Sequence, residues 1–366
     1  MLEALWAESS RKRQRACRRY PVQGASGVEV HRGERGTYFG GLQTCGHSTC
    51  PICGPAMRQA ERQRIQAIVG AHLAAGGQVY TMLLSLSHGP FDALDALLDA
   101  LAAGRSRAIG GKGGGRWARD RKRFGIAGCS WHLETVKGRN GWHPHLHVLL
   151  FTDRVLDAAE VGRMQSRVFG RYRDGLRAEG FTALESCNQV QLLRSPDAIA
   201  DYLTKGDKLG AVAAGIAAEV SRGDLKRGHG LTPSALLYRF TQTGDTADLN
   251  AFRDHEHAMR GRRWRSISPA LTKRYAPDGA AGLSAEEQDR LDSQTVQGGE
   301  HVATISLPAW GQITRTPGAV SRVRALADRR DLDGLNALIR EAEARAVAGR
   351  DRPPRRGAWT RHGTGI

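Results

Sequence analysis

Two strand-like segments joined by a short turn constrain the fold more than any other feature of this sequence. Residues 126–136 read IAGCSWHLETV, residues 145–151 read HLHVLLF, and the turn-rich segment KGRNGWHP connects them. Two strand patterns around such a segment predict a β-hairpin, which we centre on Asn140 and Gly141. Because a hairpin is antiparallel, it disfavours a doubly wound parallel sheet, whose neighbouring strands are linked by long crossovers.

Helix and strand patterns on both sides of the hairpin predict an α+β fold, with an antiparallel β-sheet and helices packed on one of its faces. Before the hairpin we expect a helix closed by Gly76 and Gly77, a strand over 78–88, a helix opened by Pro90 and Asp92 and closed at Gly104, and a flexible basic loop over 110–124. After it we expect a helix from about Ala158 to Glu179, a strand over 188–193 and a helix opened by Ser195 and Pro196.

Composition shifts along the chain of 366 residues predict several regions. They are a basic N-terminal segment with a cysteine knuckle over 1–76, the α+β domain over 77–275, a polar linker over 276–300, a helical C-terminal region over 301–348 with helices over 319–328 and 332–346, and a disordered tail over 349–366.

The charge of the chain favours a polyanionic partner. Lys and Arg number 54 against 37 Asp and Glu, which gives a formal net charge of +17. Arginine-rich segments are spread along the sequence, so a broad phosphate-facing surface is expected. No apolar run approaches the roughly 18 residues of a membrane span and no apolar signal core is present, so we expect a cytoplasmic protein without membrane contact.

Three histidines fall at the start of the second hairpin strand. Residues two apart on a strand share a face, so His145 and His147 project side by side, and our register sets Glu134 opposite His147. Two imidazoles and a carboxylate suit a catalytic metal ion with open coordination positions. His143 shares the face as an alternate ligand, and His132 is a weaker candidate. The competing interpretation is that the two strand histidines bind no metal and only form hydrogen bonds with solvent.

The segment CGHSTCPIC predicts a structural zinc site. Cys45, Cys50 and Cys53 are spaced so that three thiolates converge, and a helix follows directly. Cys17 is the first choice for the fourth ligand, and His47 is the second. In a reducing cytoplasm disulfides are disfavoured, so we interpret clustered cysteines first as metal ligands. The helix after the knuckle would present a basic surface to DNA through Arg58, Arg62 and Arg64.

A tyrosine on a later predicted helix could act as a nucleophile. Tyr202 and Lys205 lie three residues apart, on one side of a helix opened by Ser195 and Pro196. A tyrosine can attack a phosphodiester, but its ordinary pKa near 10 requires a nearby cation. Lys205 would supply that charge and Lys208 would hold a phosphate. The competing interpretation is that Tyr202 has no catalytic role and only packs against its neighbours as part of an amphipathic helix.

The order and spacing of these motifs resemble the plasmid rolling-circle replication initiators (Rep proteins) of the HUH endonuclease superfamily. YTMLLSLSHGP resembles the family's first motif, LETVKGRNGWHPHLHVLL its metal motif and IADYLTKGDK its Tyr-x-x-Lys motif. LKRGHGLTPSALL and FRDHEHAMRGRRWRSISPAL are similar to downstream segments of such initiators. The resemblance covers about residues 45–271 and implies that 77–275 form an HUH endonuclease domain.

The resemblance implies a metal-dependent single-strand nickase and strand transferase. His145, His147 and Glu134 would hold Mg²⁺ or Mn²⁺, and Tyr202 would form a 5′-phosphotyrosine link with single-stranded origin DNA. Host helicase and polymerase would be partners. Whether the protein forms a homodimer is left open by the resemblance. Some relatives carry a Glu four residues before the tyrosine, but Ala198 stands there in this chain, so the terminating residue is undetermined. Alternatives are a mobilisation relaxase, a single-strand transposase or a non-catalytic zinc-containing DNA-binding regulator.

Overall fold

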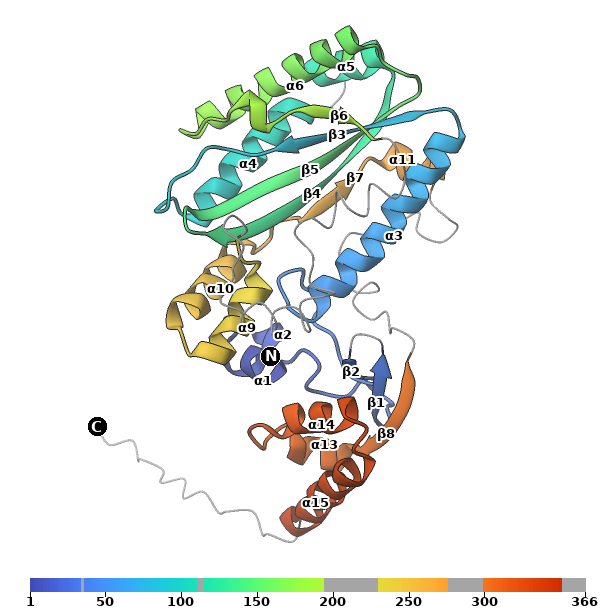
Figure 1. The fold of residues 1–366 in the computed structure, drawn as a ribbon, viewed down its shortest axis with the longest axis vertical. Helices are drawn as coiled ribbons and strands as arrows, with labels where there is room; N and C mark the ends of the chain where they lie inside the picture. Colours follow the sequence, from blue (N-terminus) through green and yellow to red (C-terminus); the bar gives the residue numbers. More distant parts are fainter. Residues whose placement is uncertain (34–35, 111–114, 194–229, 276–298, 351–366) are drawn as a thin grey trace, which may run out of the picture. The chain divides into compact units, whose positions relative to one another are not determined.

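The computed structural model describes residues 1–33, 36–110, 115–193, 230–275 and 299–350 (Figure 1). Among these residues, no helix combines the length and apolarity needed to cross a membrane. The chain divides into two compact units, which we describe separately. Unit 1 comprises Met1–Cys17 with Thr44–Thr295, and unit 2 comprises Arg18–Gln43 with Val296–Ile366. The region boundaries predicted from composition stay predictions.

A five-stranded antiparallel sheet forms the centre of unit 1. Its order is β6-β3-β5-β4-β7, and every neighbouring pair is antiparallel. The strands are β3 (Gln78–Leu84), β4 (Ile126–Gly138), β5 (Gly141–Thr152), β6 (Val190–Leu192) and β7 (Arg265–Ile267). The two longest strands, β4 and β5, are the predicted hairpin. The expected α+β class with an antiparallel sheet is confirmed.

Helices pack on both faces of this sheet, whereas one covered face was expected. On one face lie α4 (Leu94–Ile109) and α6 (Ala158–Ala178), as Figure 1 shows. On the other face, α3 (Cys53–Ala74) and α11 (Pro269–Tyr275) bury residues against β5. There Ile65 and Ile68 of α3 contact a cluster that includes Leu149 and Phe151. Because side chains alternate along β5, this second face is also the face of His145 and His147.

The expected flexible loop over 110–124 is partly wrong, because Arg116–Phe124 forms helix α5. Trp117, Asp120 and Phe124 recur at helical spacing and are all buried. The Asp120 carboxylate accepts hydrogen bonds of 2.6 Å from both Arg167 and Arg171 on α6. A basic sequence thus folds as a helix because one apolar edge and one buried acid attach it to α6.

Helix α4 begins at Leu94 and runs past Gly104, where we expected it to end, to Ile109. The glycine has a packing role instead of a terminating one. A Cβ atom on Gly104 would lie 2.7 Å from Cε2 of Tyr172, and one on Gly175 would lie 2.6 Å from the Gly104 Cα atom. The two glycines therefore allow the backbones of α4 and α6 to approach closely.

We expect Gly175→Ala to lower the free energy of unfolding by about 1–3 kcal/mol, because the added methyl group overpacks this contact. Gly170→Ala, on the same helix with open space around it, is the matched control. It should raise the stability by about 0.5–1 kcal/mol through helix propensity alone. Denaturant unfolding of both variants measures the difference, and a stabilised Gly175→Ala variant would contradict the close approach.

The remaining helices of unit 1 are α1 (Leu2–Glu8), α2 (Lys12–Arg15), α9 (Pro233–Thr243) and α10 (Thr246–Ala258). The N-terminal residues are attached to α10 by a buried acid. Glu256 accepts hydrogen bonds from the hydroxyls of Ser9, at 2.5 Å, and Ser10, at 2.8 Å. Helix α9 is capped by Thr232, whose side chain accepts a hydrogen bond from the Ala235 N–H. The backbone of Leu231, just before α9, pairs with Lys137 near the end of β4, which places α9 beside the tip of the hairpin (Figure 1).

Unit 2 combines two distant parts of the sequence in one small sheet. Strand β1 (Gly27–Gly33) lies between β2 (Gly36–Phe39) and β8 (Glu300–Ser306). Helices α13 (Leu307–Ile313), α14 (Ala319–Asp328) and α15 (Leu332–Arg350) follow β8. The helices over 319–328 and 332–346 were expected, but β8 and α13 were not. The Asp328 carboxylate accepts hydrogen bonds from the backbone N–H and hydroxyl of Thr37, at 2.7 and 2.6 Å.

Candidate functional site

The hairpin register differs from the predicted one by two residues. Gly138 pairs with Gly141, so the turn consists of Arg139 and Asn140 and not of Asn140 and Gly141. Glu134 consequently lies opposite His145, whereas we expected it opposite His147. A slip of two residues keeps each side chain on its face, so Glu134 still shares the face of both histidines.

Three potential metal ligands converge on this face of the sheet. The Nε2 atoms of His145 and His147 lie 3.1 and 2.9 Å from the same oxygen, Oε2 of Glu134. The ligand atoms of the three residues all lie within 4.8 Å of one another. Two imidazoles and one carboxylate suit a divalent ion such as Mn²⁺ or Mg²⁺, and three protein ligands leave positions for substrate oxygens. We call these three residues the triad.

Burial and neighbouring groups shift the pKa values of Glu134 and His147 in the triad. Burial raises the pKa of Glu134, but the hydrogen bonds and charges of His145 and His147 outweigh it, so this pKa lies well below its ordinary value. Burial lowers the pKa of His147, and the Glu134 hydrogen bond opposes that shift only in part. An ionised carboxylate beside a neutral imidazole is the form that binds a cation.

His143 lies on the same face but outside the triad. Its Nδ1 atom is 2.9 Å from Nε2 of His88, the residue that follows the first predicted strand. Burial, together with His145 and His88, lowers the pKa of His143 to about 4. The imidazole rings of His143 and His145 are 5.1 Å apart, and those of His145 and His147 are 5.0 Å apart. A row of imidazoles thus leads from His88 to the triad.

His132 contacts a different carboxylate, which the sequence reasoning missed. It lies opposite His147, but its Nε2 atom is 3.0 Å from Oε1 of Glu61 on α3. Glu61 also forms ion pairs with Arg64 and Arg265, and its side chain is 2% exposed. Burial raises the pKa of Glu61, yet these three partners bring it down to about 2. The sequence did contain one signal for Glu61. It comes eight residues after Cys53 and therefore lies on the same side of α3 as Cys53.

The four cysteines of the predicted knuckle form one buried group. The Sγ atom of Cys53 lies 3.5 Å from that of Cys17 and 3.7 Å from that of Cys45, and the sulfurs of Cys50 and Cys17 are 3.7 Å apart. All four side chains are buried. A closed set of four thiolates fits a structural Zn²⁺ ion. His47, the alternative fourth ligand, is not in this group, which favours Cys17.

Local contacts explain why Cys17 reaches the other three cysteines. The indole N–H of Trp6 donates a 2.7 Å hydrogen bond to the backbone carbonyl of Cys17. The Gln14 side-chain amide donates to the hydroxyl of Thr49, within the loop that carries Cys45 and Cys50. The N-terminal helices are thereby held against the knuckle.

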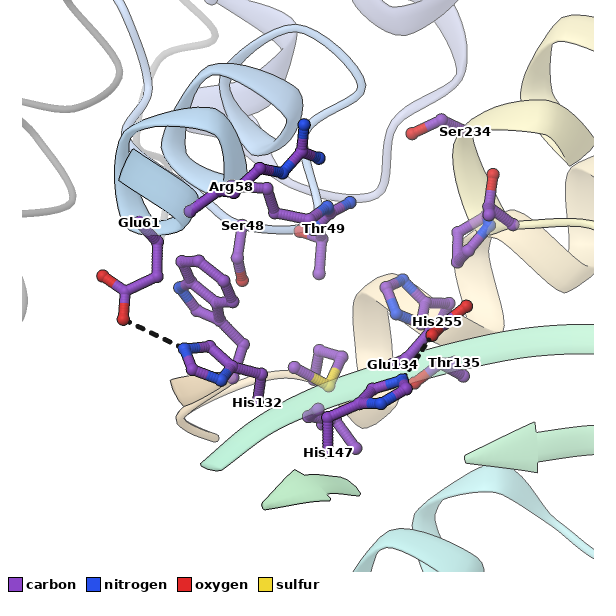
Figure 2. A pocket seen from close by; sticks show the side chains of 16 residues that line it. Ser48, Thr49, Arg58, Glu61, His132, Glu134, Thr135, His147, Ser234 and His255 are labelled. Atoms are coloured by element: carbon purple, nitrogen blue, oxygen red, sulfur yellow. Dashed lines mark hydrogen bonds and ion pairs between the residues drawn. The ribbon is translucent and has the colours of Figure 1, made fainter. Parts of the chain in front are cut away.

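A pocket adjoins the triad and is shown in Figure 2. Its walls come from the knuckle loop, helix α3, strands β4 and β5, and helices α9 and α10. The polar and charged residues that line it are Ser48, Thr49, Arg58, Glu61, Arg62, His132, Glu134, Thr135, His147, Thr232, Ser234 and His255. Of the arginines predicted to contact DNA, Arg58 and Arg62 line this pocket, whereas Arg64 pairs with Glu61. Tyr202, Lys205 and Lys208 lie outside the described residues.

Fold and site together define an α+β protein whose antiparallel sheet carries a His-His-Glu triad beside a four-cysteine cluster. Over 391 aligned residues the chain is 26% identical to "Protein rep" of Streptomyces lividans, covering 88% of this chain and 85% of the relative. It is also 29% identical over 133 residues to "Neomycin resistance protein" of Streptomyces cyanogenus, covering 30% of each chain. No protein-family model and no solved structure matches the chain. The similarity to a Rep protein that the motifs indicated is confirmed.

Proposed function

We propose that the protein is a plasmid replication initiator that nicks single-stranded DNA at an origin and joins itself to the cut strand. The observation that carries this proposal is the convergence of His145, His147 and Glu134 on one point of the sheet surface. The similarity to "Protein rep" along most of the chain supports the role in replication. The net charge of +17 supports a nucleic acid substrate.

The triad would hold Mg²⁺ or Mn²⁺, and the pair of imidazoles favours Mn²⁺. Such an ion supplies Lewis-acid polarisation of the scissile phosphate. The phenol oxygen of Tyr202 attacks phosphorus and loses its proton, and the bond from phosphorus to the 3′ oxygen breaks. The protein remains on the 5′ phosphate, and the released 3′ oxygen takes up a proton to become the primer hydroxyl. Lys205 favours the ionised phenol through its positive charge.

The four-cysteine cluster would hold a structural Zn²⁺ ion, because its ligand set is closed and leaves no position for substrate. Elongation from the 3′ hydroxyl would require a host helicase and polymerase. A mobilisation relaxase or single-strand transposase would use the same chemistry on another DNA site.

A covalent-adduct assay tests the proposal. Wild-type protein, incubated with Mn²⁺ and labelled single-stranded oligonucleotides from its own replicon, should form an adduct stable to denaturation, and Tyr202→Phe should form none. Gel electrophoresis under denaturing conditions measures the adduct. Adduct formation by Tyr202→Phe would refute the nucleophile, and binding without an adduct in wild type would indicate a non-catalytic DNA-binding regulator.

A further inference from the structure

The loop between β3 and α4 carries a phenylalanine that projects into solvent. The side chain of Phe91 is 98% exposed, whereas Val155 and Leu184, two other exposed apolar residues of unit 1, are both 63% exposed. Phenylalanine is among the residue types that are most often buried. Single apolar residues on a surface are common, however, so exposure alone does not indicate a binding partner. The structure of the loop and its place beside the triad provide the further observations.

Hydrogen bonds hold this loop in one conformation on both sides of Phe91. The side-chain amide of Asn140 donates a 3.0 Å hydrogen bond to the backbone carbonyl of His88. The backbone N–H of Gly89 donates a 2.7 Å hydrogen bond to the carboxylate of Asp92. The ring of Phe91 therefore projects from a fixed backbone. A ligand that binds to this ring would lose little affinity to ordering of the loop.

The same loop packs against the tip of the hairpin, at the start of the histidine row. A Cβ atom on Gly141, the first residue of β5, would lie 2.9 Å from the carbonyl oxygen of Pro90, which directly precedes Phe91. His88, three residues before Phe91, contacts His143. Figure 1 shows the loop from β3 to α4 beside the turn between β4 and β5. The first ligand of the triad lies four residues further along β5, or roughly 13 Å, which is a few nucleotides of a stacked strand.

A cavity of about 700 Å³ opens at this tip of the hairpin. Its charged residues are Lys137, Arg139, Arg239, Asp245 and Asp248. Arg239 and Asp248 bind each other through two hydrogen bonds of 2.5 Å. Lys137 and Arg139 belong to the hairpin itself, so the strand side of the cavity carries two cations. A DNA backbone that runs from the triad toward Phe91 would pass these cations, which suit its phosphates.

We propose that the exposed ring of Phe91 stacks on a base of single-stranded DNA, a few nucleotides from the phosphate at the triad. This inference rests on the proposed function, and it makes Phe91 a positioning residue. Every base has a flat face, so the contact would fix the path of the strand without reading its sequence. A protein partner would favour a broader apolar patch, and on this loop no second large hydrophobic side chain is exposed.

Binding to strands with and without bases tests this contact directly. The parent is full-length Tyr202→Phe protein without added Mg²⁺ or Mn²⁺, so that no adduct forms. Fluorescence anisotropy measures its affinity for a labelled oligothymidylate and for an abasic oligomer of the same length. Phe91→Ala should lower the affinity for oligothymidylate by about five- to 150-fold, the range that stacking of one base produces. The affinity for the abasic oligomer and the salt dependence of binding should not change, because no phosphate contact is lost.

Three further variants separate stacking from other effects. Phe91→Trp keeps a flat ring and should restore the preference for oligothymidylate, whereas Phe91→Leu keeps only an apolar side chain and should not. Val155→Ala removes an exposed apolar side chain just beyond the opposite end of β5 and should leave both affinities unchanged. Because both side chains are exposed, the melting temperature should match that of the parent in every variant.

The outcomes distinguish this inference from the function on which it rests. An unchanged affinity of folded Phe91→Ala protein for oligothymidylate would overturn the stacking contact, even if wild type nicks DNA, and would assign the ring to a partner other than DNA. Equal losses for the two oligomers, or a full preference for bases in Phe91→Leu, would also overturn it. A loss confined to oligothymidylate, combined with no adduct in wild type, would support the stacking contact and refute the nicking mechanism.

Discussion

Replacing His147 by alanine is expected to lower the rate of nicking by about a thousand-fold, because losing the metal's Lewis-acid action removes roughly 4 kcal/mol of transition-state stabilisation. Affinity for the single strand should stay within a few-fold, since phosphate contacts elsewhere dominate binding. The measurement is the single-turnover rate of adduct formation with Mn²⁺, together with the dissociation constant of the same oligonucleotide.

His143→Ala is the matched control for this prediction. It removes an imidazole from the same face of the same strand, but one that contacts His88 and not Glu134. Its nicking rate should stay within about ten-fold of wild type, the size of effect that residues next to a metal's ligands produce. Equal losses in the two variants would place His143 among the ligands, and an unchanged rate in His147→Ala would remove the triad from the mechanism.

Replacing Cys50 by serine should abolish binding of one zinc ion per chain and lower the melting temperature by roughly 10 °C. A structural zinc ion contributes several kcal/mol of folding free energy, and each kcal/mol shifts the melting temperature of a domain of this size by about 2–4 °C. Elemental analysis by mass spectrometry measures the zinc, and calorimetry measures the transition.

Cys187→Ser provides the matched cysteine control. Cys187 is exposed and lies outside the four-cysteine cluster, so its replacement should change neither the zinc content nor the melting temperature. Chelation of wild-type protein should reproduce the effect of Cys50→Ser. Full zinc content in Cys50→Ser would show that the ion, if bound, uses other ligands.

The sequence was sufficient to predict that the metal ligands share one face of the sheet. It was not sufficient to predict which residues pair across the hairpin. Alternation along a strand has a period of two, so His145, His147 and Glu134 were assigned to one face despite a register error of two residues. The register depends on which two residues form the turn, and Arg139 with Asn140 carries a weaker turn signal than Asn140 with Gly141. The alternating pattern therefore determines which face of the sheet carries the ligands, and the turn determines which histidine lies opposite Glu134.

Features made by packing between distant elements were not accessible from sequence patterns. Glu61 approaches His132 only because α3 packs across the second face of the sheet, a contact that no local periodicity encodes. The same packing brings Arg58 and Arg62 to the pocket of the triad. The sequence offered Cys17, which is flanked by arginines, as the first choice over His47, but its approach to the other cysteines depends on the Trp6 and Gln14 hydrogen bonds.

The central position of β1 in unit 2 has a consequence for the order of folding during synthesis. Its partner β2 emerges from the ribosome with it, but its other partner, β8, emerges only after nearly all of unit 1. A two-stranded hairpin alone is marginally stable and presents an open edge. Cys17 and Cys45 flank this hairpin and belong to one cluster, so zinc binding would tie the two ends of the nascent segment together until its last strand arrives.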